Sequence, residues 1–548
     1  MQRSALAKRV WLLFFLAAFL LYLYGLGRLP LLGPDEPRYA QIAREMLERG
    51  DPITPTLGGH PWFEKPALLY WMIMAAFGAF GVSEWAARLG PALCGLLTGL
   101  FVYLVGRRVE LKSDDEAGLS GLGLWSAAAL LSSAGMIVFS RGASFDVVVT
   151  MTLTAALACF FLAEAATGER ERRWWLGGFY AAIGASLLAK GLIGIVLPGG
   201  IIVAYFLFRR QWPAKGIALS ALWGAPLALL VAAIWYGPVT ARHGWTFIDQ
   251  FIIQHHFARY LSNKYHHPQP FYFYLPVAAL FAMPWTAFLV AALSGARRWK
   301  WRAPDSASRL RVYAFAWLIV PVAFFSLSGS KLPGYILPAL PGAALLIGER
   351  LRSYRRDAVS GIGAMRATGM GLLLLAVSIA IYLSYVGHVA SLRAIMVALP
   401  LFLVGLFVLA RASQRRWCAA LVIAATFAAT VLAVTLVLEQ GARGESVRDL
   451  IVRASERGYA TAPVLELHTV ERTSEFYAAG RVVRGSDNDV VKFEGVPEIA
   501  EAVRQRGGTA LVIVPLEFVR LLTGYAPFET EVIGDNGEIA LVAVRLRK

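Results

Sequence analysis

The sequence predicts a polytopic α-helical membrane protein with a small α/β domain at its carboxy-terminal end. Of the 548 residues, 57% are hydrophobic and only 16% are charged, and the mean hydropathy is +0.56. These values lie outside the usual range of soluble proteins. Long apolar runs recur over the first 438 residues, and short basic segments separate them in a regular alternation. Residues 439–548 lack such runs, which predicts a separate soluble region.

Thirteen apolar runs are long enough to be membrane spans, since a span needs about 20 mostly apolar residues. A cleaved signal peptide is the alternative interpretation of the first run, but the sequence YGLGRLP that follows it has no small-residue cleavage site. The runs are Val10–Leu26, Leu89–Gly106, Ala117–Ser140, Val147–Ala163, Trp174–Ala189, Gly191–Phe208, Gly216–Thr240, Phe271–Ser294, Val312–Ser330, Leu332–Gly348, Ala367–Gly387, Ala394–Ala410 and Cys418–Leu438.

Arginine and lysine concentrate at the amino terminus and in every second loop. These basic segments lie within residues 3–9, 107–112, 170–173, 209–215, 297–311, 350–366 and 411–416. Basic loops mark the cytoplasmic side, so the alternation predicts a cytoplasmic amino terminus and places residues 28–88, 241–270 and 439–548 outside. The net charge of +17 is therefore interpreted as a topology signal, and binding of nucleic acid is not expected.

Two regions outside the predicted spans have recognisable patterns. In residues 439–548, the stretches APVLELHT, TALVIVPLEFVRLL and EIALVAVRL predict strands, VPEIAEAVRQRGG predicts a helix, and DNG predicts a hairpin turn. In the outer loop, Pro37 suits a first helical turn, and Ile42, Ala43, Met46 and Leu47 form an apolar stripe. We therefore expect a transmembrane domain over residues 1–438, a loop helix along the membrane surface, and a soluble α/β domain over residues 439–548.

Ionisable residues that persist next to the spans collect on the predicted outer side. An arginine or lysine alone could be an anchor at a helix end, and a histidine alone could be a hydrogen-bonded loop residue. Several ionisable residues on one side favour a functional site. Cations there suit a substrate with a phosphate and a lipid tail. The chain has no GxxxxGK[ST] motif, so any energy for a reaction must come with the substrate. The residues are Asp35, Glu36, Arg38, Glu64, Lys65, Glu84, Arg88, Arg141, Asp146, Lys190, His256, Arg259, His267, Lys331 and Tyr335.

Five stretches carry a family resemblance, and they occur in the order DEPRYAQIAREMLERGDPITPTLGGHPWFEKPALLYW, SEWAARL, LLAKG, HPQPFYFYLP and SKLPGYILP over residues 33–340. They resemble polytopic GT-C glycosyltransferases that use polyprenyl-phosphate sugars, the superfamily of protein O-mannosyltransferases and bacterial lipid A aminoarabinose transferases. Length, span number and the small outer domain look most like the second branch. The resemblance implies a fold with about 13 transmembrane helices, an extracytoplasmic loop helix and a periplasmic carboxy-terminal domain.

The same resemblance implies a reaction. It is the transfer of 4-amino-4-deoxy-L-arabinose from undecaprenyl phosphate to a lipid A phosphate, at the periplasmic face of the bacterial inner membrane. Such a modification gives resistance to polymyxin and other cationic peptides. The expected partners are this donor, lipid A and membrane lipids, and we expect a monomer.

The resemblance also assigns roles to residues. The acidic pair Asp35 and Glu36 belongs to the active site, and we add Asp146 as a catalytic residue. A carboxylate can stabilise the oxocarbenium-like state of sugar transfer. A structural role of the acidic pair at the start of a helix is the alternative. The residues expected to bind the donor phosphate are Arg38, Lys65, Lys190, Arg259, Lys331 and Tyr335.

No cofactor is expected to be required, although a divalent metal such as zinc fits one set of residues. Glu64 with His256 and His267 could supply oxygen and nitrogen ligands. Hydrogen-bonded loop histidines are the alternative. A protein O-mannosyltransferase, or another polyprenyl-phosphate-sugar transferase, is the second enzyme interpretation. A lipid transporter or flippase belongs to a different class, for which charges near the membrane midplane and internal repeats would be expected.

Overall fold

The computed structural model describes residues 2–112, 121–251, 269–357, 360–386, 389–486 and 488–547. The chain divides into two compact units, each described here by itself. The helical unit contains Met1–Tyr24, Phe63–Leu69 and Leu89–Ala433. The mixed unit contains Gly25–Trp62, Tyr70–Arg88 and Val434–Lys548. The outer loop 28–88 therefore contributes mostly to the same compact unit as the carboxy-terminal residues.

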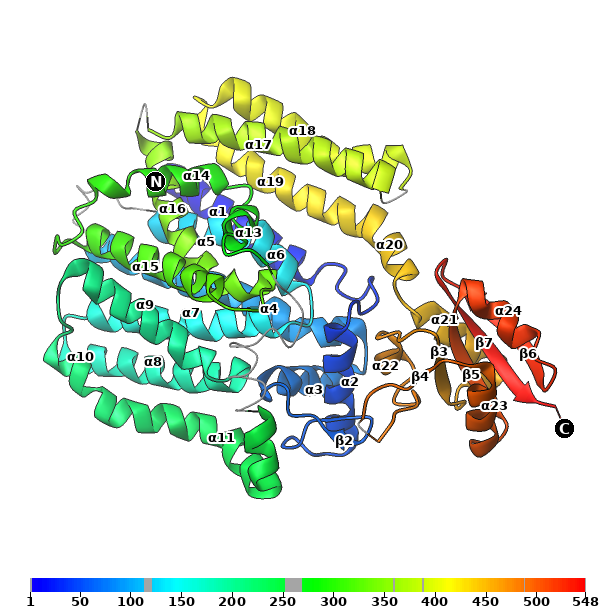
Figure 1. The fold of residues 1–548 in the computed structure, drawn as a ribbon. Helices are drawn as coiled ribbons and strands as arrows, with labels where there is room; N and C mark the ends of the chain where they lie inside the picture. Colours follow the sequence, from blue (N-terminus) through cyan, green and yellow to red (C-terminus); the bar gives the residue numbers. More distant parts are fainter. Residues whose placement is uncertain are drawn as a thin grey trace. The chain divides into compact units, whose positions relative to one another are not determined.

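The helical unit consists of long helices joined by short connections (Figure 1). Predominantly apolar runs, with most charged residues near their ends, form these helices. A bilayer-spanning backbone must satisfy its hydrogen bonds internally, which a helix does. They are α1 (Gln2–Leu23), α4 (Glu84–Lys112, which begins in the mixed unit), α5 (Leu122–Leu131), α6 (Ala134–Ser140), α7 (Phe145–Glu164), α8 (Glu169–Lys190), α9 (Ile193–Arg209), α10 (Lys215–Leu219), α11 (Ala221–Phe247), α13 (Tyr274–Phe281), α14 (Thr286–Ser294), α15 (Ser306–Ser326), α16 (Leu340–Arg356), α17 (Ile362–Ile381), α18 (Ser391–Arg411) and α19 (Arg415–Ala433).

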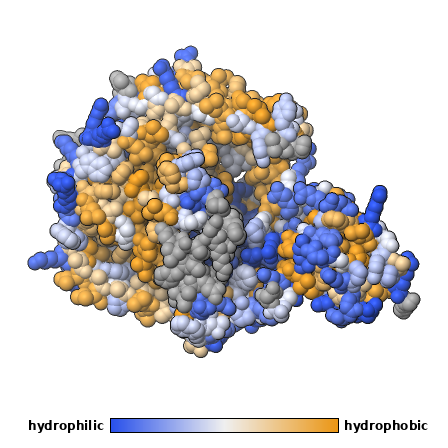
Figure 2. Space-filling model, in the orientation of Figure 1, coloured by the Kyte–Doolittle hydropathy of each residue, from blue (hydrophilic) through white to orange (hydrophobic). Residues whose placement is uncertain are grey.

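Within the described residues, seven helices are long and apolar enough to cross a membrane, or nine when each of two bent pairs counts as one span. Shorter apolar helices cover Arg9–Leu23, Leu68–Phe80 and Ile193–Arg209. Figure 2 shows that the visible surface of the helical unit is largely apolar, with hydrophilic side chains along its left edge. The predicted polytopic α-helical membrane protein is confirmed, whereas the number thirteen stays a prediction.

Two predicted spans are broken helices. The run Ala117–Ser140 contains α5 and α6, which are bent by 59°. At this break the Ser132 and Ser133 hydroxyls donate to carbonyl oxygens of the preceding turn, which satisfies backbone acceptors that the interrupted helix leaves open. The run Phe271–Ser294 contains α13 and α14, bent by 117°. Pro284 lies between them and cannot donate a backbone hydrogen bond.

Helix α7 is the buried centre of the helical unit. It packs against α8, α9 and the 3₁₀-helix η4 (Pro333–Ala339), and Figure 1 shows α7, α8 and α9 running side by side. Its buried threonines, Thr150, Thr152 and Thr154, donate to carbonyl oxygens one turn earlier, so they bury no unpaired hydroxyl. The helix begins after Ser144, whose Oγ accepts from the backbone N–H of Asp146. These contacts fix the position of Asp146.

The mixed unit begins with α2 (Asp35–Glu48), and its third residue is the predicted Pro37. Ile42, Ala43 and Met46 of the predicted stripe are completely buried in protein. Helix α2 packs against α22 (Ser474–Tyr477) and the strand β1 (Thr56–Leu57), which pairs with β2 (His60–Pro61). The apolar stripe is therefore buried within protein, and the position of this helix along the membrane surface stays a prediction. Helix α3 (Leu68–Phe80), which belongs to the mixed unit from Tyr70 on, completes this part.

A five-stranded sheet forms the carboxy-terminal part of the mixed unit, in the order β4-β3-β5-β7-β6. Strand β3 is parallel to β4 and β5, and β7 is antiparallel to β5 and β6. Side chains alternate between the two faces: Leu511 and Ile513 pack with α21 residues, and Val512 and Val514 pack with α23 residues. The remaining bounds are β3 (Val464–Leu467), β4 (Lys492–Phe493), β5 (Thr509–Pro515), β6 (Phe528–Asp535), β7 (Ile539–Leu546), α20 (Glu439–Gly444), α21 (Arg448–Ala454), α23 (Val496–Gln505) and α24 (Val519–Thr523).

Candidate active site

Arg88 organises the loop that precedes α2. Its guanidinium is buried, with 3% of the residue exposed, and donates five hydrogen bonds. Two of them form a fork on the Glu36 carboxylate, at 2.9 Å from Nε and 2.6 Å from Nη2. Planar, bidentate pairing of this kind is strong and directional. The other three reach the carbonyl oxygens of Leu26, Leu29 and Pro30, each at 2.7 Å.

The two carboxylates of the acidic pair have different surroundings. Both oxygens of Glu36 are occupied by Arg88, and one also accepts from the Leu32 N–H at 3.1 Å. Asp35 is exposed, and its carboxylate makes no hydrogen bond or ion pair with any residue that the structure describes. The helix N-cap is Pro34, so Asp35 does not cap the helix with its side chain. This geometry favours a positioning role for Glu36 and leaves the Asp35 carboxylate available to a ligand.

Arg38, predicted to bind phosphate, pairs with a buried carboxylate within the mixed unit. Its Nε lies 3.5 Å from Glu475 Oε2, and its guanidinium lies 5.2 Å from the centre of the Trp62 ring. Arg472 and Arg484 each approach the other oxygen of Glu475 at 3.3 Å. Three arginines therefore share one buried carboxylate, which leaves net positive charge around it. The phosphate-binding role of Arg38 stays a prediction.

Asp146, Lys190 and Tyr335 come together inside the helical unit. Asp146 lies in the first turn of α7 and Lys190 is the last residue of α8, positions where the helix dipoles favour these charges. The Lys190 ammonium donates to Asp146 Oδ1 and lies 4.8 Å from the centre of the Tyr335 ring. Gly334 passes so close that a Cβ there would lie 2.1 Å from Asp146 Oδ2. Both charged side chains are about one-fifth exposed, which leaves them accessible to a ligand.

Lys331 is held in the segment just before η4. Only 7% of it is exposed, and its Nζ donates to the carbonyl oxygens of Gln269 at 3.0 Å and Ser328 at 2.7 Å. The segment is also bound by Tyr274, whose hydroxyl donates to the Leu332 carbonyl oxygen at 3.1 Å. An ammonium carries three protons, so one donor of Lys331 has no acceptor among the described residues. A buried cation with a spare donor is suited to an anion.

Glu64 and Lys65 form an ion pair at 2.7 Å, and both side chains are largely buried. The preceding Phe63 packs its ring against His243 and Phe247 of α11, which anchors this short segment to the helical unit. Arg259, His256 and His267, predicted as phosphate and metal ligands, lie outside the described residues. Within the described part of the chain, no group of three His, Cys, Asp or Glu side chains could hold a metal ion, so the zinc prediction is not tested.

Tyr477 is a functional candidate that the sequence did not indicate. Its hydroxyl accepts from the Leu31 N–H at 2.8 Å and donates to Glu84 Oε1 at 3.0 Å. Arg448 lies 3.5 Å from the same Glu84 oxygen. The carboxy-terminal residues thus fix the loop that leads to Asp35. No sequence signal could have revealed this contact, because 446 residues separate Leu31 from Tyr477.

Arg141 has a structural role in the helical unit. Its guanidinium donates to the carbonyl oxygens of Leu21 at 2.7 Å and Tyr24 at 2.6 Å, and so satisfies acceptors at the end of α1.

Glu466 of β3 is a buried carboxyl group under α22. Burial raises the pKa of Glu466 to about 7, although the Ser474 hydroxyl and the Glu471 N–H donate to it.

Comparisons with known proteins agree with this architecture. The family model described as dolichyl-phosphate-mannose-protein mannosyltransferase matches residues 9–295. A curated protein of Pseudomonas paraeruginosa, named undecaprenyl phosphate-alpha-4-amino-4-deoxy-L-arabinose arabinosyl transferase, is 34% identical over 418 residues, which cover 75% of this chain and 72% of that protein. A protein of the same name from Pseudomonas aeruginosa is 33% identical over 419 residues, with the same coverage of both chains.

A solved structure shares the fold over nearly the whole chain. It is ArnT from Cupriavidus metallidurans bound to undecaprenyl phosphate, with a TM-score of 0.77 and 24% identity, and the match covers 97% of each chain. The apo state of the same protein has a TM-score of 0.76 at 23% identity and 98% coverage of each chain.

Proposed function

The chain belongs to the family of undecaprenyl phosphate-alpha-4-amino-4-deoxy-L-arabinose arabinosyl transferases, and we propose that it transfers 4-amino-4-deoxy-L-arabinose from undecaprenyl phosphate to a phosphate of lipid A. As a member of this family it is a multi-pass membrane glycosyltransferase that uses a polyprenyl-phosphate sugar donor. Added aminoarabinose would lower the negative charge of lipid A. Cells would then resist polymyxin and other cationic peptides.

In the proposed reaction, the bond between the anomeric carbon and the donor phosphate oxygen breaks, and a lipid A phosphate oxygen forms the new bond. The acceptor needs no general base, because a phosphate is already an anion at pH 7. Positive charge develops on the sugar, and negative charge develops on the departing undecaprenyl phosphate. A carboxylate for the sugar and cations for the phosphate are therefore the groups that this chemistry requires.

The observation that carries the proposal is the half-buried group of Asp146, Lys190 and Tyr335 in the helical unit. Charges are costly next to apolar spans and mark polar substrates there. We assign the donor phosphate to Lys190 with Lys65 and Lys331. Asp146 would orient the Lys190 ammonium, and the Tyr335 hydroxyl would donate to a phosphate oxygen. Arg38 and Arg259 complete the predicted set of phosphate-binding residues.

Asp35 is the carboxylate that we assign to the sugar. Its exposed side chain, which has no partner in the described residues, supports this assignment. It would hold the sugar amine or stabilise the developing positive charge. Glu36 would have a positioning role, because it binds Arg88, and Arg88 holds the loop before α2 by its hydrogen bonds to backbone carbonyl oxygens. This contact would set the position of Asp35. The steps proposed here run without a metal ion, and zinc at Glu64, His256 and His267 is a separate prediction.

The proposed topology has thirteen spans in the inner membrane, with residues 439–548 in the periplasm and the protein as a monomer. The alternation of basic loops supports this orientation. A reporter fused after Lys548 that is active only in the cytoplasm should be silent. Activity of that reporter would contradict the odd number of spans.

Mass spectrometry of lipid A from cells with and without this protein tests the proposed function. An increase of one pentosamine on lipid A, dependent on the protein, is the expected result. Unchanged lipid A would overturn the proposal. The match to the mannosyltransferase family model favours transfer to a protein hydroxyl as the second candidate, for which glycosylated protein would appear in the same cells instead.

A further inference from the structure

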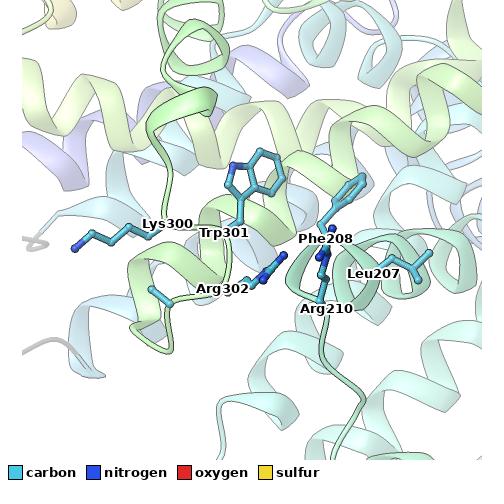
Figure 3. A pocket seen from close by; sticks show the side chains of 7 residues that line it. Leu207, Phe208, Arg210, Lys300, Trp301 and Arg302 are labelled. Atoms are coloured by element: carbon cyan, nitrogen blue, oxygen red, sulfur yellow. The ribbon is translucent and has the colours of Figure 1, made fainter.

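A pocket of about 690 Å³ lies in the helical unit, apart from all the residues assigned above. It is formed by the carboxy-terminal end of α9 and the segment 300–303 before α15. Figure 3 shows the side chains that line it, with the Arg302 guanidinium extending toward Arg210. The lining residues are Leu207, Phe208, Arg210, Lys300, Trp301, Arg302 and Ala303.

The three cations of the pocket are exposed, and none of their side chains makes a hydrogen bond or ion pair with another residue in the described part of the chain. Two arginines of the following helix α15 are paired instead, whereas Arg297 and Arg298 are exposed like the pocket cations. Arg309 contacts Glu164 at 2.6 Å, and Arg311 contacts Glu349 at 2.5 Å. No carboxylate lines the pocket, and the nearby Asp305 caps α15 through the Ser308 N–H. Arg210 and Arg302 thus leave positive charge facing an open space, whereas the Lys300 ammonium extends away from both of them (Figure 3).

The walls of the pocket are held in place by several contacts. Arg209 donates to the Ala303 carbonyl oxygen at 3.2 Å, which joins the two segments. Phe208 and Trp301 meet edge to face at 5.8 Å, and the Trp301 Nε1 donates to the Ala296 carbonyl oxygen at 3.1 Å. Arg210 has a φ of 51°, the left-handed conformation that ends α9. A strained non-glycine residue at a helix end is a feature that functional sites often contain.

An apolar row on α9 leads into the pocket. Val196, Val203 and Leu207 are 46%, 57% and 68% exposed, and they lie on one face of the helix with Gly199. A Cβ at Gly199 would meet no atom within 4 Å, so the row has a gap in its middle. In a spanning helix such an exposed row faces lipid. A ligand that combines an anion with an alkyl chain matches both the row and the cations.

We propose that this pocket binds the phosphate headgroup of an anionic membrane lipid, with one acyl chain along the Val196–Leu207 row of α9. Basic side chains next to spans attract anionic lipids, and tryptophans favour the membrane interface. Residues 209–215 and 297–311 are predicted to be cytoplasmic, so the lipid would come from the cytoplasmic leaflet. Free phosphate would match the cations, but it would make no use of the apolar row.

Binding to the full-length protein in detergent tests the proposal. The probes are phosphatidylglycerol, phosphatidylcholine with the same acyl chains, and inorganic phosphate, and native mass spectrometry measures bound lipid. Phosphatidylglycerol should bind preferentially. The double variant Arg210→Ala/Arg302→Ala should bind it about 30-fold more weakly. The matched control Arg170→Ala/Arg366→Ala removes two exposed cations elsewhere in the predicted cytoplasmic loops, and it should bind like the parent.

A second variant separates the lipid from free phosphate. Gly199→Leu adds a side chain at the gap in the apolar row, where a Cβ would meet no atom within 4 Å, and leucine is a better helix former than glycine. It should weaken phosphatidylglycerol binding at least fivefold. The proposal is overturned if either variant binds phosphatidylglycerol like the parent, if the control loses as much affinity as the double variant, or if inorganic phosphate binds as tightly as the lipid.

Discussion

Replacing Arg88 with lysine keeps the positive charge but removes the planar fork that holds the loop before Asp35. The guanidinium donates five hydrogen bonds, whereas an ammonium has three protons. At least two buried acceptors therefore lose their donor. Each costs about 1–3 kcal/mol, so the loop should lose about 2–6 kcal/mol of local stability. This makes opening of residues 26–36 at least 30-fold more frequent, in order of magnitude.

Hydrogen exchange of residues 26–36, followed by mass spectrometry on the full-length protein, measures this effect directly. Arg520→Lys is the matched control, since the exposed Arg520 side chain forms no hydrogen bond with a described residue. Its effect should stay within about 0.5 kcal/mol. Turnover should fall in Arg88→Lys more than donor affinity does, because the loop positions Asp35. Parental exchange rates in residues 26–36 would refute the argument that the guanidinium fork holds this loop.

Three further predictions concern pH, the donor phosphate and metal. Because the pKa of Glu466 is raised to about 7 from 4.5, the folded sheet keeps a proton that the unfolded chain releases, and its stability should fall by up to about 3 kcal/mol between pH 4.5 and 7. Urea unfolding at pH 5 and pH 8 should show this slope, Glu466→Gln should flatten it, and an unchanged slope in the variant contradicts the assignment. Lys190→Ala and Lys331→Ala should each lose about 1.5–3 kcal/mol of undecaprenyl phosphate binding, and parental affinity in both would show that the pocket is wrong. If zinc binds as predicted, elemental analysis should find about one ion per purified chain and much less in Glu64→Gln, whereas metal-free parent protein rules the site out.

Local sequence patterns were sufficient to predict those helices and strands that periodicity and turn residues define. The strands β3 and β7 and the helix α23 lie where alternation and helical periodicity predicted them. Only the first half of the predicted strand TALVIVPLEFVRLL is a strand, β5, because the residues after Pro515 form a 3₁₀-helix (Leu516–Phe518) and α24. The DNG turn also joins β6 to β7 as expected. Pro37 and the apolar stripe identified α2. The stripe could not reveal what buries it, because burial in protein and burial in a membrane need the same apolar side chains.

Hydropathy alone could not detect where apolar runs bend. A window over Phe271–Ser294 averages across Pro284, and the 117° bend leaves the mean unchanged. Hydropathy also missed an interruption in the run Leu332–Gly348. Its first residues form η4, and the helix α16 begins only at Leu340. Pro333 and Pro338 within that run were the signals for this interruption.

The sequence predicted which residues belong to the candidate site, but it did not predict which residues they contact. An acidic pair before a helix drew attention to Asp35 and Glu36 together, and the structure separates them by their surroundings. Arg88 and Tyr477 determine that difference, and both are distant from the pair in sequence. Contacts across such separations depend on tertiary packing, which periodicity does not contain.

The transfer rate of purified Asp35→Asn tests the central claim most directly, with undecaprenyl-phosphate aminoarabinose as donor and lipid A as acceptor. Turnover should fall at least about 100-fold, the scale of losing one electrostatic or acid–base contribution. Affinity for undecaprenyl phosphate without sugar should change little. Glu48→Gln, an exposed charge at the other end of α2, is the matched control and should keep the parental rate. Transfer by Asp35→Asn at the parental rate would contradict a catalytic role and leave only the effect of the charge on the helix dipole.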